Sequence, residues 1–328
     1  MRRADIVTLA VVCAAIAAFA IISKNAFFLD LTFAALLFAV LGQAWNWISG
    51  YAGQVSFGHA LFFGCGAYGS ALANWHHLSP WIGVLWGVAA AAVIALIVGF
   101  PCFALRGHYF SIATIAVAAI GEIYAKNANW LNGAVGIELT LAPPGLGNLQ
   151  FTDKTPWVLI ALVVFAAVQG ATMLLAGSRM GYYLRAIRAN QEAAASVGID
   201  ARAWKLRALI ASAIAAALGG SLYAQYNLVV EPESILSISV SISIALVGVV
   251  GGLGQLWGPA LGALTYAFLA KYVAAQLGGT GRGLDLVIYG GLICVIAALR
   301  PSGLAGLIAL LFHRRPAFEQ VHAEEIPS

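Results

Sequence analysis

The chain has 328 residues, of which 62% are hydrophobic and 9% are charged, and its mean hydropathy is +0.90. A soluble domain of this length carries about 25% charged residues, so the composition excludes an ordinary water-soluble protein and favours one whose solvent is the lipid bilayer. The net charge of +4 is small, and no nucleic-acid partner is expected.

Ten segments are apolar enough to cross a bilayer, which takes about 20 mostly apolar residues. We expect an all-α, polytopic membrane protein with about ten transmembrane helices, which form one transmembrane domain over residues 1–328. The first segment is interpreted as a membrane helix, because no small-residue site for signal cleavage ends it. The expected spans cover residues 5–23, 27–48, 55–74, 81–100, 109–126, 156–176, 206–226, 235–250, 258–276 and 284–299.

Lysine and arginine gather in alternate loops. With the N-terminus in the cytoplasm, twelve of the 17 basic residues lie on the cytoplasmic side and five on the outer side. Cytoplasmic loops of membrane proteins carry such an excess. The bias therefore predicts that both termini are cytoplasmic, with a cytoplasmic loop near 177–205, a periplasmic loop near 127–155 and a cytoplasmic tail near 300–328.

The third expected span is rich in glycine and holds the first candidate pathway residues. Glycine permits breaks where backbone groups line a cavity, so the segment 55–74 is either a continuous span or a broken or re-entrant one, and both interpretations stay open. Gln54, Ser56 and His59 add polar groups to the same stretch. They are candidates to line a solute pathway, although His59 also fits a packed, hydrogen-bonded residue.

Glu122 is the most deeply placed carboxylate of the predicted spans. An ionisable group inside a membrane is a candidate functional residue. Glu122 can contact a solute, pair with Lys126 one helical turn later, or stabilise helix packing.

The cytoplasmic loop has a composition that favours a helix from Gly181 to Val197. Leu184, Ile187 and Val197 are expected to form its apolar edge. Gly198 ends this helix as a C′ glycine, and Asp200 caps the next one. Such a helix fits a groove on a soluble partner or a position on the lipid surface, and both interpretations stay open.

A second glycine-rich passage runs from Gly251 to Ala270. Its Gly254-Gln255 aligns with Gly53-Gln54 of the first passage. This weak internal repeat indicates a duplicated core with parallel halves. The alternating serines between Ser237 and Ser243 favour a helix contact over a wet lining.

Catalytic and metal-binding patterns are absent from the sequence. The four cysteines form no CxxC or Cys/His cluster, so no metal is expected. The chain has no GxxxxGK[ST] phosphate-binding loop, so a chain that uses ATP must be a different one and no cofactor is expected here. No spacing of residues supports an enzyme. The cysteines are Cys13, Cys65, Cys102 and Cys294.

Several sequence motifs resemble those of ATP-binding-cassette (ABC) importer permeases. Glu192-Ala193-Ala194 followed by Gly198 matches their EAA…G pattern, without the usual Leu-Pro continuation. Five motifs in family order resemble the high-affinity branched-chain amino-acid permease family, in particular its M-type subunits. They are GYAGQVSFGHALFFGCGAY, LRGHYFSIATIAVAAIGEI, RAIRANQEAAASVGI, VGGLGQLWGPALGA and RGLDLVIYGGLICVIAALRPSGLAGL.

This resemblance implies a permease subunit that provides a translocation pathway in a bacterial inner membrane. It also implies a coupling helix that docks on the ATPases, and the corresponding residues here are Arg185, Arg188, Glu192, Ala193, Ala194 and Gly198. The implied partners are two ABC ATPase subunits, a homologous H-type permease subunit and a periplasmic solute-binding protein.

The substrate stays open at this stage. The stretch from Asn132 to Gly136, with Cys65 and Gly69, departs from the usual family pattern. The expected solutes are branched-chain or related amino acids, and the alternatives are urea, amides or small aromatic acids. An ion-coupled secondary transporter is a further alternative, but it needs carboxylates at the bilayer midplane and only Glu122 comes near.

Overall fold

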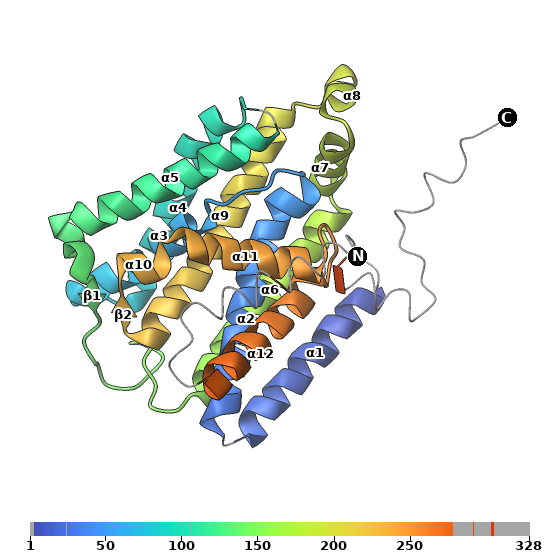
Figure 1. Ribbon diagram of the computed structural model, residues 1–328. Coiled ribbons are helices and arrows are strands. Elements are labelled where there is room, and N and C mark those ends of the chain that lie inside the picture. The colour runs from blue at the N-terminus through green and yellow to red at the C-terminus, as the bar shows by residue number, and fades with distance from the viewer. Residues whose placement is uncertain (1–2, 24, 106, 278–290, 292–302, 305–328) are drawn as a thin grey trace.

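The computed structural model describes residues 3–23, 25–105 and 107–277, together with the isolated residues 291, 303 and 304 (Figure 1). The tenth expected span, 284–299, and the expected tail, 300–328, lie outside the described residues apart from these single positions.

The described chain is almost entirely helical, as its composition predicts. The elements are α1 (Arg3–Ile22), α2 (Ala26–Asn46), the π-helix η1 (Trp47–Tyr51), α3 (His59–Trp75), α4 (Pro80–Cys102), α5 (His108–Asn127), the short 3-10 helices η2 (Asn129–Leu131) and η3 (Gly133–Val135), β1 (Ile137–Glu138), α6 (Thr155–Gly177), α7 (Arg179–Ala189), α8 (Gln191–Ser196), α9 (Ala201–Asn227), β2 (Val229–Val230), α10 (Pro232–Ile235), α11 (Ile238–Gly251) and α12 (Gly258–Leu277).

Seven helical segments of the described chain are long and apolar enough to cross a membrane. They are Ala4–Ile22, Ala26–Tyr51, Pro80–Cys102, His108–Asn127, Thr155–Gly177, Ala201–Asn227 and Pro232–Gly251. The expected spans 55–74 and 258–276 also coincide with helices, but these are shorter in apolar length. The chain is thus a multi-pass membrane protein, and the count of ten spans stays a prediction.

Two interruptions break the helical pattern. The first break, residues 52–58, separates η1 from α3, and the second break, residues 252–257, separates α11 from α12. Residues 55–74 are therefore not a continuous helix. Side chains satisfy the freed backbone of the first break: Trp45 Nε1 donates to the Ser56 carbonyl at 2.7 Å, and Ser49 Oγ donates to the Gln54 carbonyl at 2.9 Å. Irregular backbone persists inside a membrane only with such partners.

Helix α3 packs closely against α4 and α9 through glycines. A Cβ atom added to Gly66 of α3 would lie 1.9 Å from the Ala217 carbonyl oxygen of α9, and one added to Gly87 of α4 would lie 2.8 Å from Gly66 Cα. Small residues let membrane helices approach in this way, because lipid tails supply no hydrophobic driving force between helices. These contacts fix the position of α3 despite its short length.

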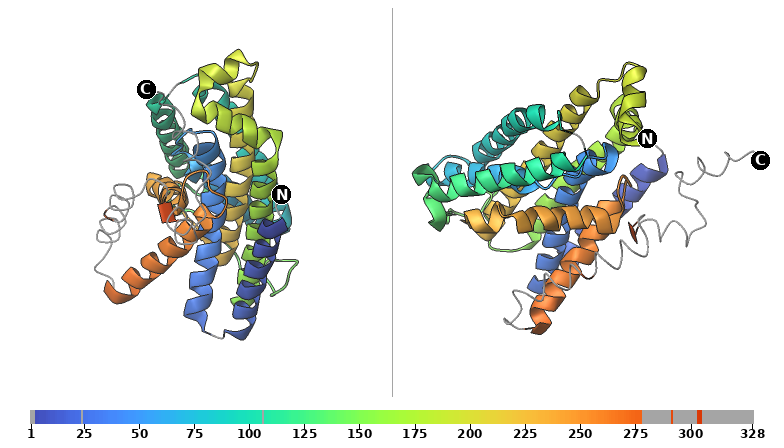
Figure 2. Two further views of the ribbon diagram at one scale, coloured as in Figure 1. Left: turned by 90° about the vertical axis from the view of Figure 1, so that its right-hand side faces the viewer. Right: turned by 45° about the horizontal axis from the view of Figure 1, so that its top comes forward.

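The α7–α8 segment, residues 179–198, and the β1–β2 pair lie at opposite ends of the helical bundle (Figure 1, Figure 2). At the β end, Ile137 pairs with Val230 and Glu138 pairs with Val229 in an antiparallel register. The ion pair between Lys154 Nζ and Asp30 Oδ2, 2.5 Å long, ties the start of α6 to α2 nearby. The expected outer loop, near 127–155, is therefore anchored at two places, by the pairing of β1 with β2 and by the ion pair of Lys154 with Asp30.

Candidate functional site

The α7–α8 segment consists of two helices rather than the single helix expected from Gly181 to Val197. Asn190 interrupts it with an extended backbone, at φ −157° and ψ 110°. Its side-chain Oδ1 accepts hydrogen bonds from the N–H groups of Glu192 and Ala193, at 3.0 and 3.1 Å. An Asn N-cap starts a new helix because it satisfies donors that the first turn leaves free.

The end of α8 agrees with the sequence-based expectation. Gly198 has a φ of +86°, its N–H donates to the Ala195 carbonyl, and the Ile199 N–H donates to the Ala194 carbonyl. These are the two hydrogen bonds of a Schellman motif, which needs a left-handed residue at C′. The Asp200 side chain caps α9 by accepting from the N–H groups of Arg202 and Ala203. Both expected turn signals are confirmed.

One face of α8 is fastened to its neighbours. Ala194 is buried in a small apolar cluster with Ile187 of α7 and Ala201 of α9. Lys205 Nζ, at the start of α9, donates to Gln191 Oε1 at 2.7 Å. These contacts attach α8 to both α7 and α9.

The opposite face of α8 is exposed. Glu192 and Ala193 are exposed there, and Val197 is 75% exposed. Leu184 and Ile187 form a buried apolar edge on α7, as expected, whereas the exposed Val197 lies apart from them at the end of α8, so the expected edge is wrong for Val197. Leu184 and Ile187 pack into the protein because α7 lies against its own bundle. The exposed surface is thus a small patch with one carboxylate and one apolar side chain.

Arg185 and Arg188 point from α7 toward the protein. Arg185 Nη2 donates to the Ala176 carbonyl at 3.1 Å, and its guanidinium lies 4.8 Å from the ring centre of Tyr182. Arg188 Nη1 donates to the carbonyl of Gly50, at the end of η1. Burial lowers the pKa of Arg188, which remains charged because the ordinary value is so high.

The second break is held by buried amide side chains of α2 and α6. Asn46 Nδ2 donates to the Gln255 carbonyl at 3.2 Å, and Asn46 Oδ1 accepts from the Gly254 N–H at 2.8 Å. Gln43 Nε2 donates to the Leu256 carbonyl at 2.7 Å and to Gln169 Oε1 at 2.5 Å. Gln169 Nε2 also donates to the Leu256 carbonyl, at 2.9 Å. The sequence analysis missed Gln43, Asn46 and Gln169, although polar amides within apolar spans were the available signal.

The two passages of the weak internal repeat meet in space. A Cβ atom on Gly50, next to the first break, would lie 2.5 Å from the Gly254 nitrogen in the second. Gly53 and Gly254, which align in the repeat, have similar φ angles of +71° and +75°. The positive φ angle at both positions explains why both are glycine. The duplication of the core stays a prediction.

Two of the four candidate pathway residues, Gln54 and Ser56, belong to the first break, and His59 follows it as the first residue of α3. Gln54 is partly exposed, whereas Ser56 and His59 are buried. His59 Nε2 lies 2.8 Å from Ser212 Oγ, which donates to the Ala44 carbonyl at 2.6 Å. Ser212 therefore accepts from His59, which fixes the Nε2–H tautomer. This arrangement matches the packed, hydrogen-bonded interpretation of His59.

Glu122 lies on another element. The Phe57 N–H donates to Thr114 Oγ1 of α5, and Glu122 is about 12 Å further along that helix, at about 1.5 Å per residue. Lys126 Nζ lies 2.7 Å from Glu122 Oε1, which confirms the ion pair with Lys126 that was one of three interpretations. The structure therefore does not join Glu122 to the other three candidates.

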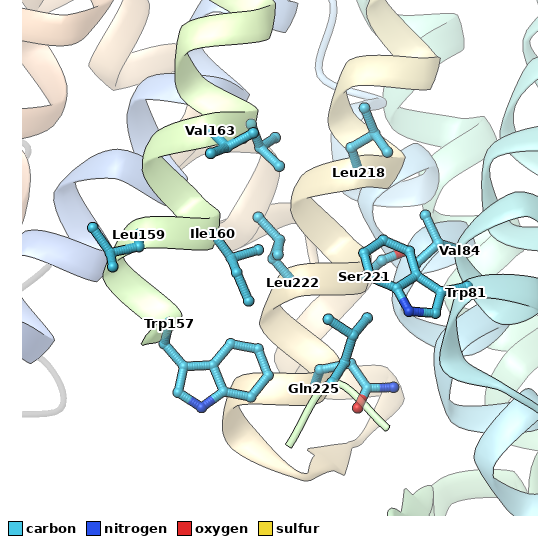
Figure 3. Close-up of a pocket in the computed structure, with 12 residues that line it drawn as sticks. Trp81, Val84, Trp157, Leu159, Ile160, Val163, Leu218, Ser221, Leu222 and Gln225 are labelled. Atoms are coloured by element: carbon cyan, nitrogen blue, oxygen red, sulfur yellow. The ribbon is translucent and has the colours of Figure 1, made fainter. Parts of the chain in front are cut away.

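An apolar cavity of about 330 Å³ lies apart from both breaks, between α4, α6 and α9 (Figure 3). Trp157 and Ile160 of α6 face Leu222 of α9 across it, and Trp81 of α4 closes its far side. The Gln225 amide at one end has no hydrogen-bond partner among the described residues. None of the candidate pathway residues lines this cavity.

A comparison with known families decides the identity. The profile of the family described as "Branched-chain amino acid transport system / permease component" matches residues 25–297. The chain belongs to this family. The match includes both helix breaks and the whole α7–α8 segment, so these features lie within the family's shared region.

Individual members of the permease family are similar over most of the chain. The high-affinity branched-chain amino acid transport system permease protein LivM of Escherichia coli K12 is 26% identical over 299 residues, which cover 84% of this chain and 69% of the relative. The corresponding LivH protein of that strain is 26% identical over 304 residues, 87% of this chain and 93% of the relative. A nucleoside ABC transporter permease, NupC of Lactococcus lactis, is 24% identical over 58% of this chain and 63% of its own length. No solved structure matches this chain.

Proposed function

We propose that this chain is the M-type permease subunit of an ATP-driven importer for branched-chain amino acids. The observation that carries the proposal is the family match over residues 25–297, together with the similarity to LivM over 84% of the chain. Both LivM and LivH are named as permease proteins of a high-affinity branched-chain amino acid transport system. The chain provides part of the pathway and hydrolyses nothing itself.

The α7–α8 segment is the proposed docking surface for two ABC ATPase subunits. It projects at one end of the bundle, it presents Glu192 and Val197 outward, and it is fastened to α9 by Lys205 (Figure 1). A helix that projects from the bundle but is fixed to it suits the transfer of movement from the ATPases to the membrane helices. A loosely attached helix would move without displacing its neighbours. The lipid-surface interpretation fits less well, since the α7–α8 segment exposes only two large hydrophobic side chains, Tyr182 and Val197.

The assembly and its location follow from the same proposal. A homologous H-type permease completes the pathway, and a periplasmic solute-binding protein delivers the solute at the β1–β2 end. The protein lies in a bacterial inner membrane with both termini in the cytoplasm, so α8 is cytoplasmic. Selective labelling of Val197→Cys from inside and Thr152→Cys from outside tests this orientation, and the opposite pattern contradicts it.

The alternative solutes and an ion-coupled mechanism receive no support from the described residues. Glu122, the carboxylate nearest to a coupling role, is paired with Lys126. Asp30 is likewise paired with Lys154. A coupling carboxylate needs to gain and lose its ion at the membrane midplane, which these pairs disfavour.

The proposal is tested by solute-stimulated ATP hydrolysis. The full chain is co-expressed with a homologous H-type permease, ABC ATPase subunits and a solute-binding protein from the same organism, purified as a complex and reconstituted in lipid vesicles. We expect leucine, isoleucine and valine with the binding protein to stimulate hydrolysis, and urea, benzoate, acetamide and adenosine not to do so. Stimulation by one of the other solutes alone contradicts the proposed substrate, and failure of the ATPase subunits to co-purify contradicts the proposed class.

A further inference from the structure

Arg188 is the point at which the α7–α8 segment touches both helix breaks. Its Nη1 donates to the carbonyl of Gly50, which lies two residues before the first break. A Cβ atom on Gly254, in the second break, would lie 2.8 Å from that same Nη1 atom. One on Gly53 would lie 2.8 Å from Arg188 Cγ. The side chain therefore fits against three glycines that belong to two separate stretches of sequence.

Glycine at these positions leaves the space that the arginine occupies. Any larger residue at Gly53 or Gly254 would displace the Arg188 side chain. A side chain on Gly50 would push the two breaks apart, because its Cβ would lie 2.5 Å from the Gly254 nitrogen. Gly53 and Gly254 also adopt left-handed backbone angles that disfavour other residues. Backbone shape and space thus both suit an arginine at this junction.

Guanidinium chemistry suits a junction of broken helices. A break leaves backbone carbonyls without their helical donors, and a guanidinium presents five N–H donors in a fixed planar fork. Arg188 is also two residues before Asn190, the cap of α8. A displacement of α8, which begins at Gln191, therefore reaches the Arg188 backbone through only two intervening residues.

We propose that Arg188 is a positioning residue that links the α7–α8 segment to both helix breaks and transmits its movement to them. This inference rests on the proposed function, because the movement originates where the ATPases bind. The hydrogen bond from Arg188 to the Gly50 carbonyl is directional. A shift of α7 therefore either displaces the first break in the same direction or breaks this bond, so that Arg188 donates to another acceptor. The second break follows, because Gly50 and Gly254 are in direct backbone contact and Asn46 binds Gly254 and Gln255.

The alternative is that Arg188 stabilises the fold without transmitting movement. The two roles differ in what they change. A purely structural role alters thermal stability and the amount of assembled complex, whereas a transmitting role alters the ratio of solute-stimulated to basal ATP hydrolysis in an assembled complex.

The test compares Arg188→Ala and Arg188→Lys with Arg207→Ala in the reconstituted complex. Arg207 is an exposed arginine near the start of α9, outside the proposed docking segment, so it controls for the loss of one positive charge. The measurements are ATPase co-purification, thermal stability, and the fold stimulation of hydrolysis by leucine with its binding protein.

We expect Arg188→Ala to retain the ATPase subunits and to lower the fold stimulation about tenfold, within the range of coupling changes seen for residues between two sites. Arg188→Lys keeps the positive charge and N–H donors without the planar fork and should recover part of the stimulation. Arg207→Ala should match the unmodified chain. Wild-type stimulation in Arg188→Ala, or loss of assembly in both Arg188 variants, overturns the inference. Failure of the unmodified complex to assemble overturns the proposed function instead, so the two failures are distinguishable.

A second readout follows the first break directly. Gln54 is partly exposed in it, so a Gln54→Cys variant reports its accessibility to a soluble maleimide. We expect ATP to change the labelling rate at this cysteine with Arg188 present and not with Arg188→Ala. An equal ATP effect in both backgrounds overturns the inference even if the hydrolysis ratio changes.

Discussion

Asn46 Oδ1 accepts a hydrogen bond from the Gly254 N–H at 2.8 Å, although the two residues are 208 positions apart in sequence. The same side chain donates through Nδ2 to the carbonyl of Gln255 at 3.2 Å. One amide of α2 thus satisfies a donor and an acceptor of the second break. Asn46 is fully buried, so water cannot hydrogen-bond to these two backbone groups and the Asn46 amide satisfies them instead.

Replacing Asn46 with alanine should destabilise the protein. The substitution leaves the Gly254 N–H and the Gln255 carbonyl without this partner, and a buried unsatisfied group costs about 1–3 kcal/mol. The midpoint of thermal unfolding in detergent should therefore fall. Asn127→Ala is the matched control, since its exposed Nδ2 only bonds Ile123 of its own helix, and an equal loss in both variants would contradict this account of the break.

Gly66→Ala tests the close contact between α3 and α9. The added Cβ would lie 1.9 Å from the Ala217 carbonyl oxygen, which is backbone and cannot rotate away. Overpacking of this kind costs about 1–3 kcal/mol, so we expect a lower unfolding midpoint and less protein in the membrane. Gly170→Ala in α6 meets no atom within 4 Å and should be tolerated, and equal tolerance at Gly66 would show that the helices are further apart.

Gly198 should tolerate asparagine better than alanine. A Cβ at this position meets no atom within 4 Å, so the cost of a substitution is conformational alone. The φ of +86° is costly for alanine, about 1–2 kcal/mol, whereas asparagine enters left-handed conformations more readily. ATPase co-purification and thermal stability should both rank Gly above Asn above Ala, and equal values for the two variants would exclude the left-handed cap.

Glu192→Arg should weaken ATPase association without preventing membrane insertion. Glu192 is exposed in the first turn of α8, where a carboxylate favours the positive end of the helix dipole and where the docking surface is proposed. The matched charge reversal is Glu138→Arg in β1, exposed at the opposite end of the bundle. Normal pull-down of the ATPases by Glu192→Arg, or an equal loss with Glu138→Arg, would contradict the docking role.

Much of the fold follows from composition and local signals. Apolar length predicts each membrane helix in the described chain. The glycine-rich stretch around His59 allows a broken helix there but leaves a continuous one equally open. The caps at Gly198 and Asp200 are local as well, because each depends on a side chain or φ angle within about four residues. Such features can be deduced without knowledge of the tertiary structure.

The partners of the polar groups are not local, and the sequence does not supply them. Gln43 bonds Gln169 across 126 residues, and Arg188 bonds Gly50 across 138. Nothing in the apolar pattern of α2 indicates which amide meets which break. Asn190 was missed for a related reason, since its role depends on a backbone angle that composition in a helix-favouring stretch does not reveal.

ATP-driven uptake of leucine by lipid vesicles tests the central claim most directly. The vesicles contain the full complex, with ATP and the solute-binding protein added on opposite sides of the membrane. Accumulation of radiolabelled leucine should require ATP, the ATPase subunits and the binding protein together, and a proton or sodium gradient should not replace ATP. Gradient-driven accumulation by this chain alone would contradict its assignment as a permease subunit of an ATP-driven importer.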